Sequence, residues 1–77
     1  MAFTDSQCYD TDAFRQGRAS CRTHYTKVGR GECEELPLPD NPYKVGTPLF
    51  FCWNRGWNSV DLYLIDKILR EAANVND

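Results

Sequence analysis

Apolar residues in the last third of the chain recur at intervals of three or four, the spacing of one face of an α-helix. Thr47 is a suitable N-cap, and Pro48 fits the first helical position, where no amide hydrogen is needed. Together these features predict a helix over residues 48–73. The predicted face consists of Leu49, Trp53, Gly56, Trp57, Val60, Leu64, Ile68 and Ala72.

The sequence also contains a place where this helix can bend or restart. Gly56 lowers helix propensity there, and Asn58 with Asp61 forms a candidate capping pair. The sequence is therefore compatible with either one kinked helix or two consecutive helices.

A second helical stripe lies near the start of the chain, after the N-cap candidates of segment 10–12. It predicts a helix over residues 11–25. Gly17 inside the stripe costs about 1 kcal/mol relative to alanine, which is best explained by close packing of another helix. The stripe comprises Ala13, Phe14, Gly17 and Cys21, followed by His24 or Tyr25.

The segment between these helices, residues 26–47, is rich in glycine and proline. Proline restricts its own φ and the residue before it, so Leu36 and Leu38 should lie extended across a helical surface. The Asn41-Pro42-Tyr43 segment is typical of a turn that carries an anchor. We expect Tyr43 to pack against the tryptophans.

These elements predict an all-α fold in one domain over residues 1–77. Two helices, or three if the long one breaks, should cross where Gly17 and Gly56 allow close approach, with the connector packed on them. With 77 residues, 42% of them hydrophobic and 13% aromatic, the core is small but the chain is globular. The second helix also has apolar residues outside its main stripe, which a partner protein or a second copy could cover: Phe50, Phe51, Leu62, Tyr63, Ile65 and Leu69.

The net charge of −2 disfavours a nucleic-acid or ribosomal partner, because such binding relies on a cationic surface. A local basic face remains open if Arg15, Arg18, Arg22, Lys27 and Arg30 segregate; the alternative is a solvated helix surface neutralised by neighbouring acidic residues.

The first residues lack a basic and apolar leader pattern, and no apolar run is long enough to cross a bilayer. We therefore expect a cytoplasmic protein without a membrane partner. Thiols are mostly reduced in that compartment, so Cys8, Cys21, Cys33 and Cys52 are predicted to be free.

The sequence contains few residues in a pattern typical of a metal site or a catalytic site. The cysteines lack the close pairs of a zinc ligand set, and only Cys21 and His24 lie within a helical turn of each other. No third orienting residue, oxyanion motif or Walker sequence accompanies them. We therefore predict no enzyme, no cofactor, no bound metal and no small-molecule substrate. A zinc-stabilised module is kept as an alternative.

Trp53 and Trp57 could stack nucleobases or anchor a protein interface. Their position on the main stripe favours a role in the core.

Three blocks in order, comprising 13–19, then Asn41-Pro42-Tyr43 with Thr47-Pro48, then Trp53-Asn54-Arg55-Gly56-Trp57, resemble the ribosome modulation factor family. This family includes small proteins associated with ciprofloxacin resistance. The resemblance covers about residues 13–57 and implies two helices joined by a connector, with binding to the small ribosomal subunit. The founding members are strongly basic, whereas this chain is slightly acidic.

The leading functional hypothesis is a small non-enzymatic binding protein of this type, acting in translation regulation in bacteria. The alternative is a phage- or plasmid-type regulator that binds a host protein through the apolar face of its C-terminal helix. The predicted partner-binding residues are Arg15, Arg18, Arg22, Tyr43, Trp53, Arg55 and Trp57.

Overall fold

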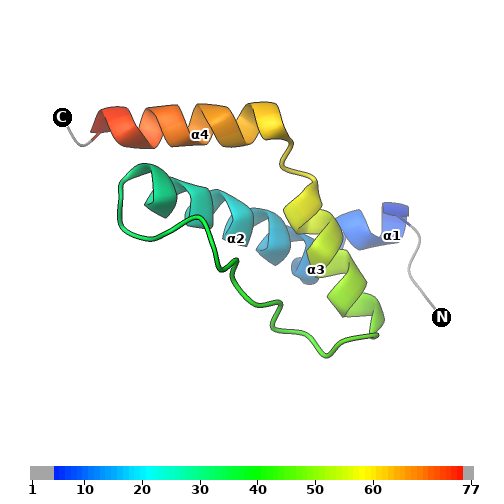
Figure 1. Ribbon diagram of the computed structural model, residues 1–77. Helices are drawn as coiled ribbons and strands as arrows, with labels where there is room; N and C mark the ends of the chain where they lie inside the picture. Colours follow the sequence, from blue (N-terminus) through cyan, green and yellow to red (C-terminus); the bar gives the residue numbers. More distant parts are fainter. Residues whose placement is uncertain (1–4, 76–77) are drawn as a thin grey trace.

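The computed structural model describes residues 5–75 of the chain, with the side chains of residues 7–74. In this part the secondary structure is entirely helical, so the all-α class is confirmed (Figure 1). The described residues form four helices rather than the two or three expected. They are α1 (Asp5–Tyr9), α2 (Asp12–Gly29), α3 (Pro48–Asn58) and α4 (Leu62–Val75).

Helix α2 begins at the predicted place and continues one turn beyond the predicted end. The Thr11 side chain accepts a hydrogen bond from the Phe14 amide at 3.2 Å, which satisfies one free donor of the first turn. The predicted stripe is the buried face, and it continues to His24 rather than to the half-buried Tyr25.

The predicted long helix over 48–73 is interrupted at residues 59–61, so the continuous alternative is wrong. The break lies after Gly56, which stays inside α3. The Ser59 hydroxyl donates to the Gly56 carbonyl at 2.6 Å, and the Asp61 carboxylate accepts from the Leu64 amide at 2.8 Å. These two bonds end one helix and cap the next, as the candidate cap at Asp61 indicated.

Helices α2 and α3 cross at the two glycines, as predicted. A Cβ atom built on Gly17 would lie 2.0 Å from the Trp53 carbonyl oxygen, and one built on Gly56 would lie 2.0 Å from the Phe14 carbonyl oxygen. Either methyl group would collide with backbone, which cannot rotate away as a side chain can. The crossing therefore requires hydrogen at both positions.

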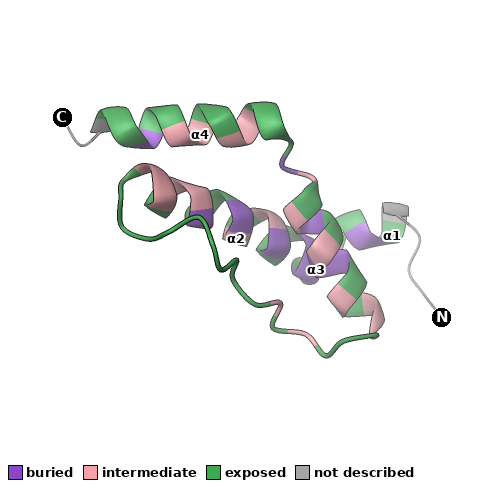
Figure 2. Ribbon diagram, in the orientation of Figure 1, coloured by how far each residue is buried: buried purple, intermediate pink, exposed green. Residues whose placement is uncertain are grey.

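Helix α4 lies beside the C-terminal half of α2, and both run in the same direction (Figure 1). The approach is close at Gly29, where an added Cβ would lie 2.8 Å from the Ala72 Cβ. The outward side of α4 is exposed along most of its length (Figure 2).

The connector is held to the helices by polar contacts. His24 Nε2 lies 2.9 Å from the Glu35 carbonyl oxygen, Asn41 donates to the Phe50 carbonyl at 2.9 Å, and the Tyr43 hydroxyl donates to Gln16 at 2.9 Å. Tyr43 packs against the core cluster that includes Trp53, which confirms its predicted place. Leu36, in contrast, is 69% exposed and does not cover a helix as expected.

The prediction of four free cysteines is wrong for two of them. Cys8 and Cys52 form a disulfide that joins α1 to α3, while Cys21 is buried and free and Cys33 is exposed and free. Helix α1 was not predicted, because five residues are too few to give a periodic signal. None of the described helices is both long and apolar enough to cross a membrane.

Candidate binding surface

The two tryptophans belong mainly to the core. Their rings stack with centroids 5.6 Å apart, and Trp53 is only 5% exposed. Trp57 is half-buried and its ring also lies near those of His24 and Tyr25. Trp53 therefore has almost no surface for a partner, and Trp57 can offer only an edge.

A hollow of ≈ 770 Å³ separates α3 from the connector, and both tryptophans line it. Two of the amide side chains that line it, those of Asn41 and Asn54, are paired within the protein. Asn41 bonds Phe50 and the Asn54 side chain, and its own side-chain oxygen accepts from the Tyr43 amide. The predicted site residues Tyr43, Trp53 and Trp57 thus lie together, in an arrangement that positions the connector.

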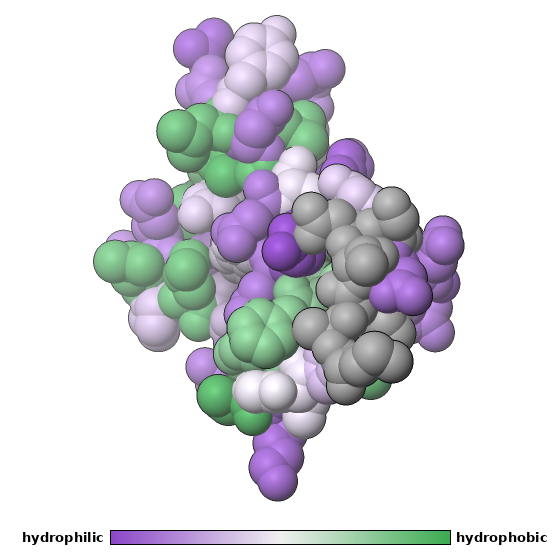
Figure 3. Space-filling view, turned by 90° about the vertical axis from the view of Figure 1, so that its right-hand side faces the viewer, coloured by the Kyte–Doolittle hydropathy of each residue, from purple (hydrophilic) through white to green (hydrophobic). Residues whose placement is uncertain are grey.

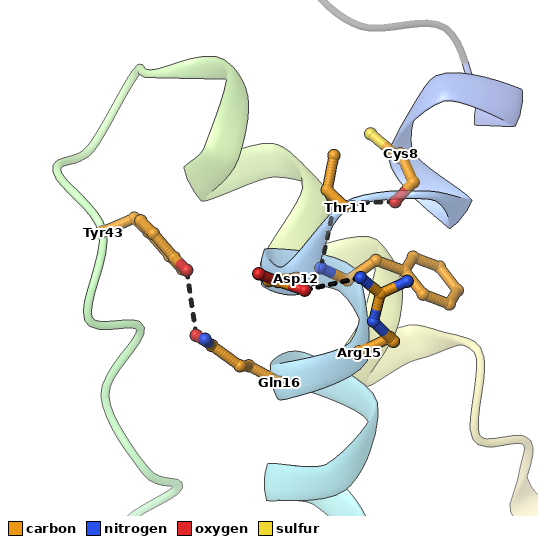
Figure 4. A network of polar contacts seen from close by, with 7 residues as sticks. Cys8, Thr11, Asp12, Arg15, Gln16 and Tyr43 are labelled. Carbon is orange, nitrogen blue, oxygen red and sulfur yellow. Dashed lines mark hydrogen bonds and ion pairs between the residues drawn. The ribbon is translucent and has the colours of Figure 1, made fainter.

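The predicted arginines of α2 lie on another side of the helix. Arg15, Arg18 and Arg22 follow intervals of three and four and share one side. Figure 4 shows Gln16 reaching toward Tyr43 and Arg15 pointing away from that pair. The structure thus separates the arginines from the connector, whose hollow against α2 is lined instead by Gln16, Ser20, Thr23 and Lys27.

Arg55 joins these arginines at the end of α3. Arg18 donates to the Ser59 hydroxyl at 3.1 Å, and Arg55 lines a hollow of ≈ 240 Å³ together with Ser59, Tyr9, Phe14 and Asn58. Ser59 is therefore a common neighbour of two guanidinium-bearing residues from different helices.

Arg22 lies in a furrow of ≈ 220 Å³ between α2 and α4, which it shares with Arg30. We call the set Arg15, Arg18, Arg22, Arg30 and Arg55 the arginine surface. It follows one side of α2 from its first turn to its C-cap and includes the adjacent end of α3.

Acidic groups lie close to the arginine surface. Arg15 pairs with Asp12, Arg30 lies 3.8 Å from Glu32, and Glu71 lines the same furrow as Arg22. The Arg15–Asp12 and Arg30–Glu32 pairs are well exposed, and exposed pairs of this kind contribute little to stability. Their arginines can exchange one anionic partner for another with small loss.

The Cys21 and His24 pair has little capacity for nucleophilic chemistry. Burial raises the pKa of the Cys21 thiol, which disfavours the reactive thiolate at neutral pH. His24 is buried, and its Nε2 is engaged with the Glu35 carbonyl. Burial first, then the charges of Cys21 and Glu35, raise the pKa of the neighbouring Tyr25 phenol, so it stays neutral.

Within the described part of the chain, no three residues of the His, Cys, Asp and Glu types come close enough to hold a metal ion. The zinc-stabilised alternative thus finds no ligand set there.

Sequence reasoning missed two parts of this surface. Ser59 has a signal, since serine after Asn58 at the end of an apolar run is a frequent cap and can orient a neighbour. The sequence contains no signal that Tyr9 lines the hollow beside Arg55. Its neighbour Cys8 is joined by a disulfide to Cys52, a residue far along the chain.

Comparison with family models, with curated proteins and with solved structures returned no match to this chain. The resemblance to the ribosome modulation factor family therefore stays a prediction.

Proposed function

We propose that this protein is a small non-enzymatic binding protein that attaches to an anionic surface of a large assembly through its arginine surface. The observation that carries the proposal is the segregation of arginines from α2 and α3 onto one side, with Arg18 and Arg55 both beside Ser59. The family resemblance supplies the particular partner, the small ribosomal subunit.

Guanidinium groups suit this task because their planar donors match phosphate oxygens. Arg15, Arg22 and Arg55 are exposed, and Arg18 is half-buried and oriented by Ser59. A net charge of −2 means that any such attachment is local, since the remaining surface repels a polyanion. We therefore expect binding that weakens steeply with salt.

Co-sedimentation with small ribosomal subunits tests this proposal. We expect the protein to pellet with the subunits at low salt and to be released progressively as the salt rises. Absence from the pellet at both low and moderate salt would exclude this partner.

A second candidate function follows from α4. Leu62 and Tyr63 at its start are 83% and 80% exposed, and Leu64, Ile65, Ile68 and Leu69 are only half-buried. Figure 3 shows hydrophobic atoms in the upper part of the view, beneath hydrophilic and pale atoms at its top. Such a surface suits a protein partner, as a regulator of a host protein would need.

A pull-down from bacterial lysate with and without nuclease separates the two candidates. Capture that nuclease abolishes supports the arginine surface. Nuclease-resistant capture of one protein, lost when Leu62 and Tyr63 are both changed to serine, supports α4. The matched control is the Asp66→Ser and Lys67→Ser double variant, which alters the exposed side of the same helix.

A further inference from the structure

The hollow between α3 and the connector, which Trp53 and Trp57 line, contains a hydrogen-bond donor that the fold does not use. We call it the tryptophan hollow. Trp53 is 5% exposed, and its ring stacks on Trp57. Within the described part of the chain, no residue accepts a hydrogen bond from its indole N–H. Polar groups on buried residues are nearly always paired in folded proteins, so this donor requires an explanation.

The indole nitrogen of Trp53 is not sealed inside the core. Among the described residues that are not exposed, every side-chain nitrogen or oxygen without a hydrogen-bond partner has contact with solvent. Trp53 lines the tryptophan hollow but not the hollows beside Arg55, Lys27 or Arg22. Its N–H is therefore open to the tryptophan hollow, and the small exposed part of the side chain is enough for one hydrogen bond.

The walls of the tryptophan hollow are largely apolar and come from both sides. Helix α3 contributes the rings of Phe50, Trp53 and Trp57. The connector contributes Leu38 and Val45, which are 44% and 79% exposed. A hollow of ≈ 770 Å³ with this lining suits a small molecule that has an apolar ring.

Two polar side chains beside the rings restrict the chemistry of such a molecule. The Asn54 oxygen accepts from Asn41 at 3.1 Å, while the Asn54 amino group has no acceptor among the described residues. Asp40 also lines the hollow, and its carboxylate has no ion pair or hydrogen bond in that part of the chain. The indole N–H and the amino group call for an acceptor, because neither can accept. The carboxylate disfavours an acceptor that is negatively charged.

We propose that the tryptophan hollow binds a small uncharged aromatic molecule whose carbonyl oxygen accepts a hydrogen bond from the Trp53 N–H. The ring of the ligand packs on the apolar walls, and Asp40 selects against the corresponding carboxylate. No residue of the arginine surface lines this hollow, so the site goes beyond the function proposed above and does not depend on it.

The test is a titration of the full, folded chain with three probes of similar shape, followed in ¹H–¹⁵N NMR spectra. The probes are benzamide, benzoate and toluene. The chain has two tryptophans, so its two indole N–H signals report separately, and a Trp57→Phe variant assigns them. We expect benzamide to move the Trp53 signal downfield until it saturates, because a new hydrogen bond deshields the proton. Toluene, which has no acceptor, should cause no downfield shift.

Benzoate measures the role of Asp40. It has the shape of benzamide and a negative charge, and a like charge about 5 Å away should weaken its binding about fourfold. Asp40→Asn removes the charge at nearly constant size, so benzoate should bind this variant about as tightly as benzamide does. Misfolding cannot produce that gain. The matched control is Asp66→Asn on the exposed side of α4, which should leave the fourfold difference in place.

Three outcomes would overturn the proposal, whichever result co-sedimentation with the ribosomal subunit gives. The first is a Trp53 signal that benzamide leaves unmoved up to its limit of solubility. The second is an equal shift with all three probes, which would indicate apolar contact without a hydrogen bond. The third is weak binding of benzoate that persists in the Asp40→Asn variant.

Discussion

At the scale of single residues, the α2–α3 crossing depends on the absence of two side chains. Gly17 and Gly56 each face a carbonyl oxygen of the other helix, and the two contacts are reciprocal. Helix propensity alone would favour alanine at both positions by about 1 kcal/mol. The geometry predicts instead that alanine at either position destabilises the fold, because its methyl group would collide with the other helix.

We expect Gly17→Ala to lower the free energy of unfolding by about 3 kcal/mol, because the new methyl group would force the helices apart. Urea denaturation followed by tryptophan fluorescence measures this, since Trp53 lies at the contact. The control is Ala19→Gly on the exposed side of the same helix, which should cost only about 1 kcal/mol. A Gly17→Ala protein as stable as the parent would contradict the crossing.

Residue-level reasoning from the sequence succeeded where the reason for a residue is local. The Thr47 side chain caps α3 by accepting from the Phe50 amide, and Thr11 caps α2 in the same way. It failed for Cys8 and Cys52, because pairing over a separation of 44 residues depends on the fold and on the redox state of the compartment.

At the scale of elements, a few polar groups break the chain into α3 and α4, although the apolar stripe runs on through the break. Val60 in the break is buried, so the apolar periodicity continues through a segment that is not helical. The periodicity of side chains therefore could not distinguish one helix from two, and the capping groups of Ser59 and Asp61 decided between them.

Replacing Asp61 with alanine should destabilise the start of α4. The Leu64 amide would lose its acceptor, at a cost of about 1 kcal/mol. Hydrogen exchange should report faster exchange in residues 62–65 with α2 unchanged. Asp66→Ala on the exposed side of α4 serves as the control, and equal effects of the two changes would refute the cap.

Connector placement was partly predictable. The Asn41-Pro42-Tyr43 turn anchors the segment as its composition indicated, because Asn41 accepts from the Tyr43 amide and also bonds α3. The exposure of Leu36 was not predictable from proline chemistry, which restricts the backbone but does not decide which surface it meets.

At the scale of the whole molecule, the proposed binding of an anionic partner depends more on where the charges lie than on the net charge. Overall acidity argued against an anionic partner, yet the arginines of the predicted site occupy one side of α2 and the end of α3. The sequence spacing anticipated this for Arg15, Arg18 and Arg22. The position of Arg55 beside them depends on the crossing angle of the helices, which spacing cannot supply.

The most direct measurement of the central claim compares two alanine substitutions, each of which removes one cationic side chain, on opposite sides of α2. Arg22→Ala removes a cation from the arginine surface, and Lys27→Ala removes one from the side facing the connector. The observable is the dependence of small-subunit affinity on salt concentration. We predict that Arg22→Ala weakens binding and lowers the slope by about one ion, while Lys27→Ala leaves both unchanged. Equal effects of the two substitutions, or no effect of either, would contradict binding through the arginine surface.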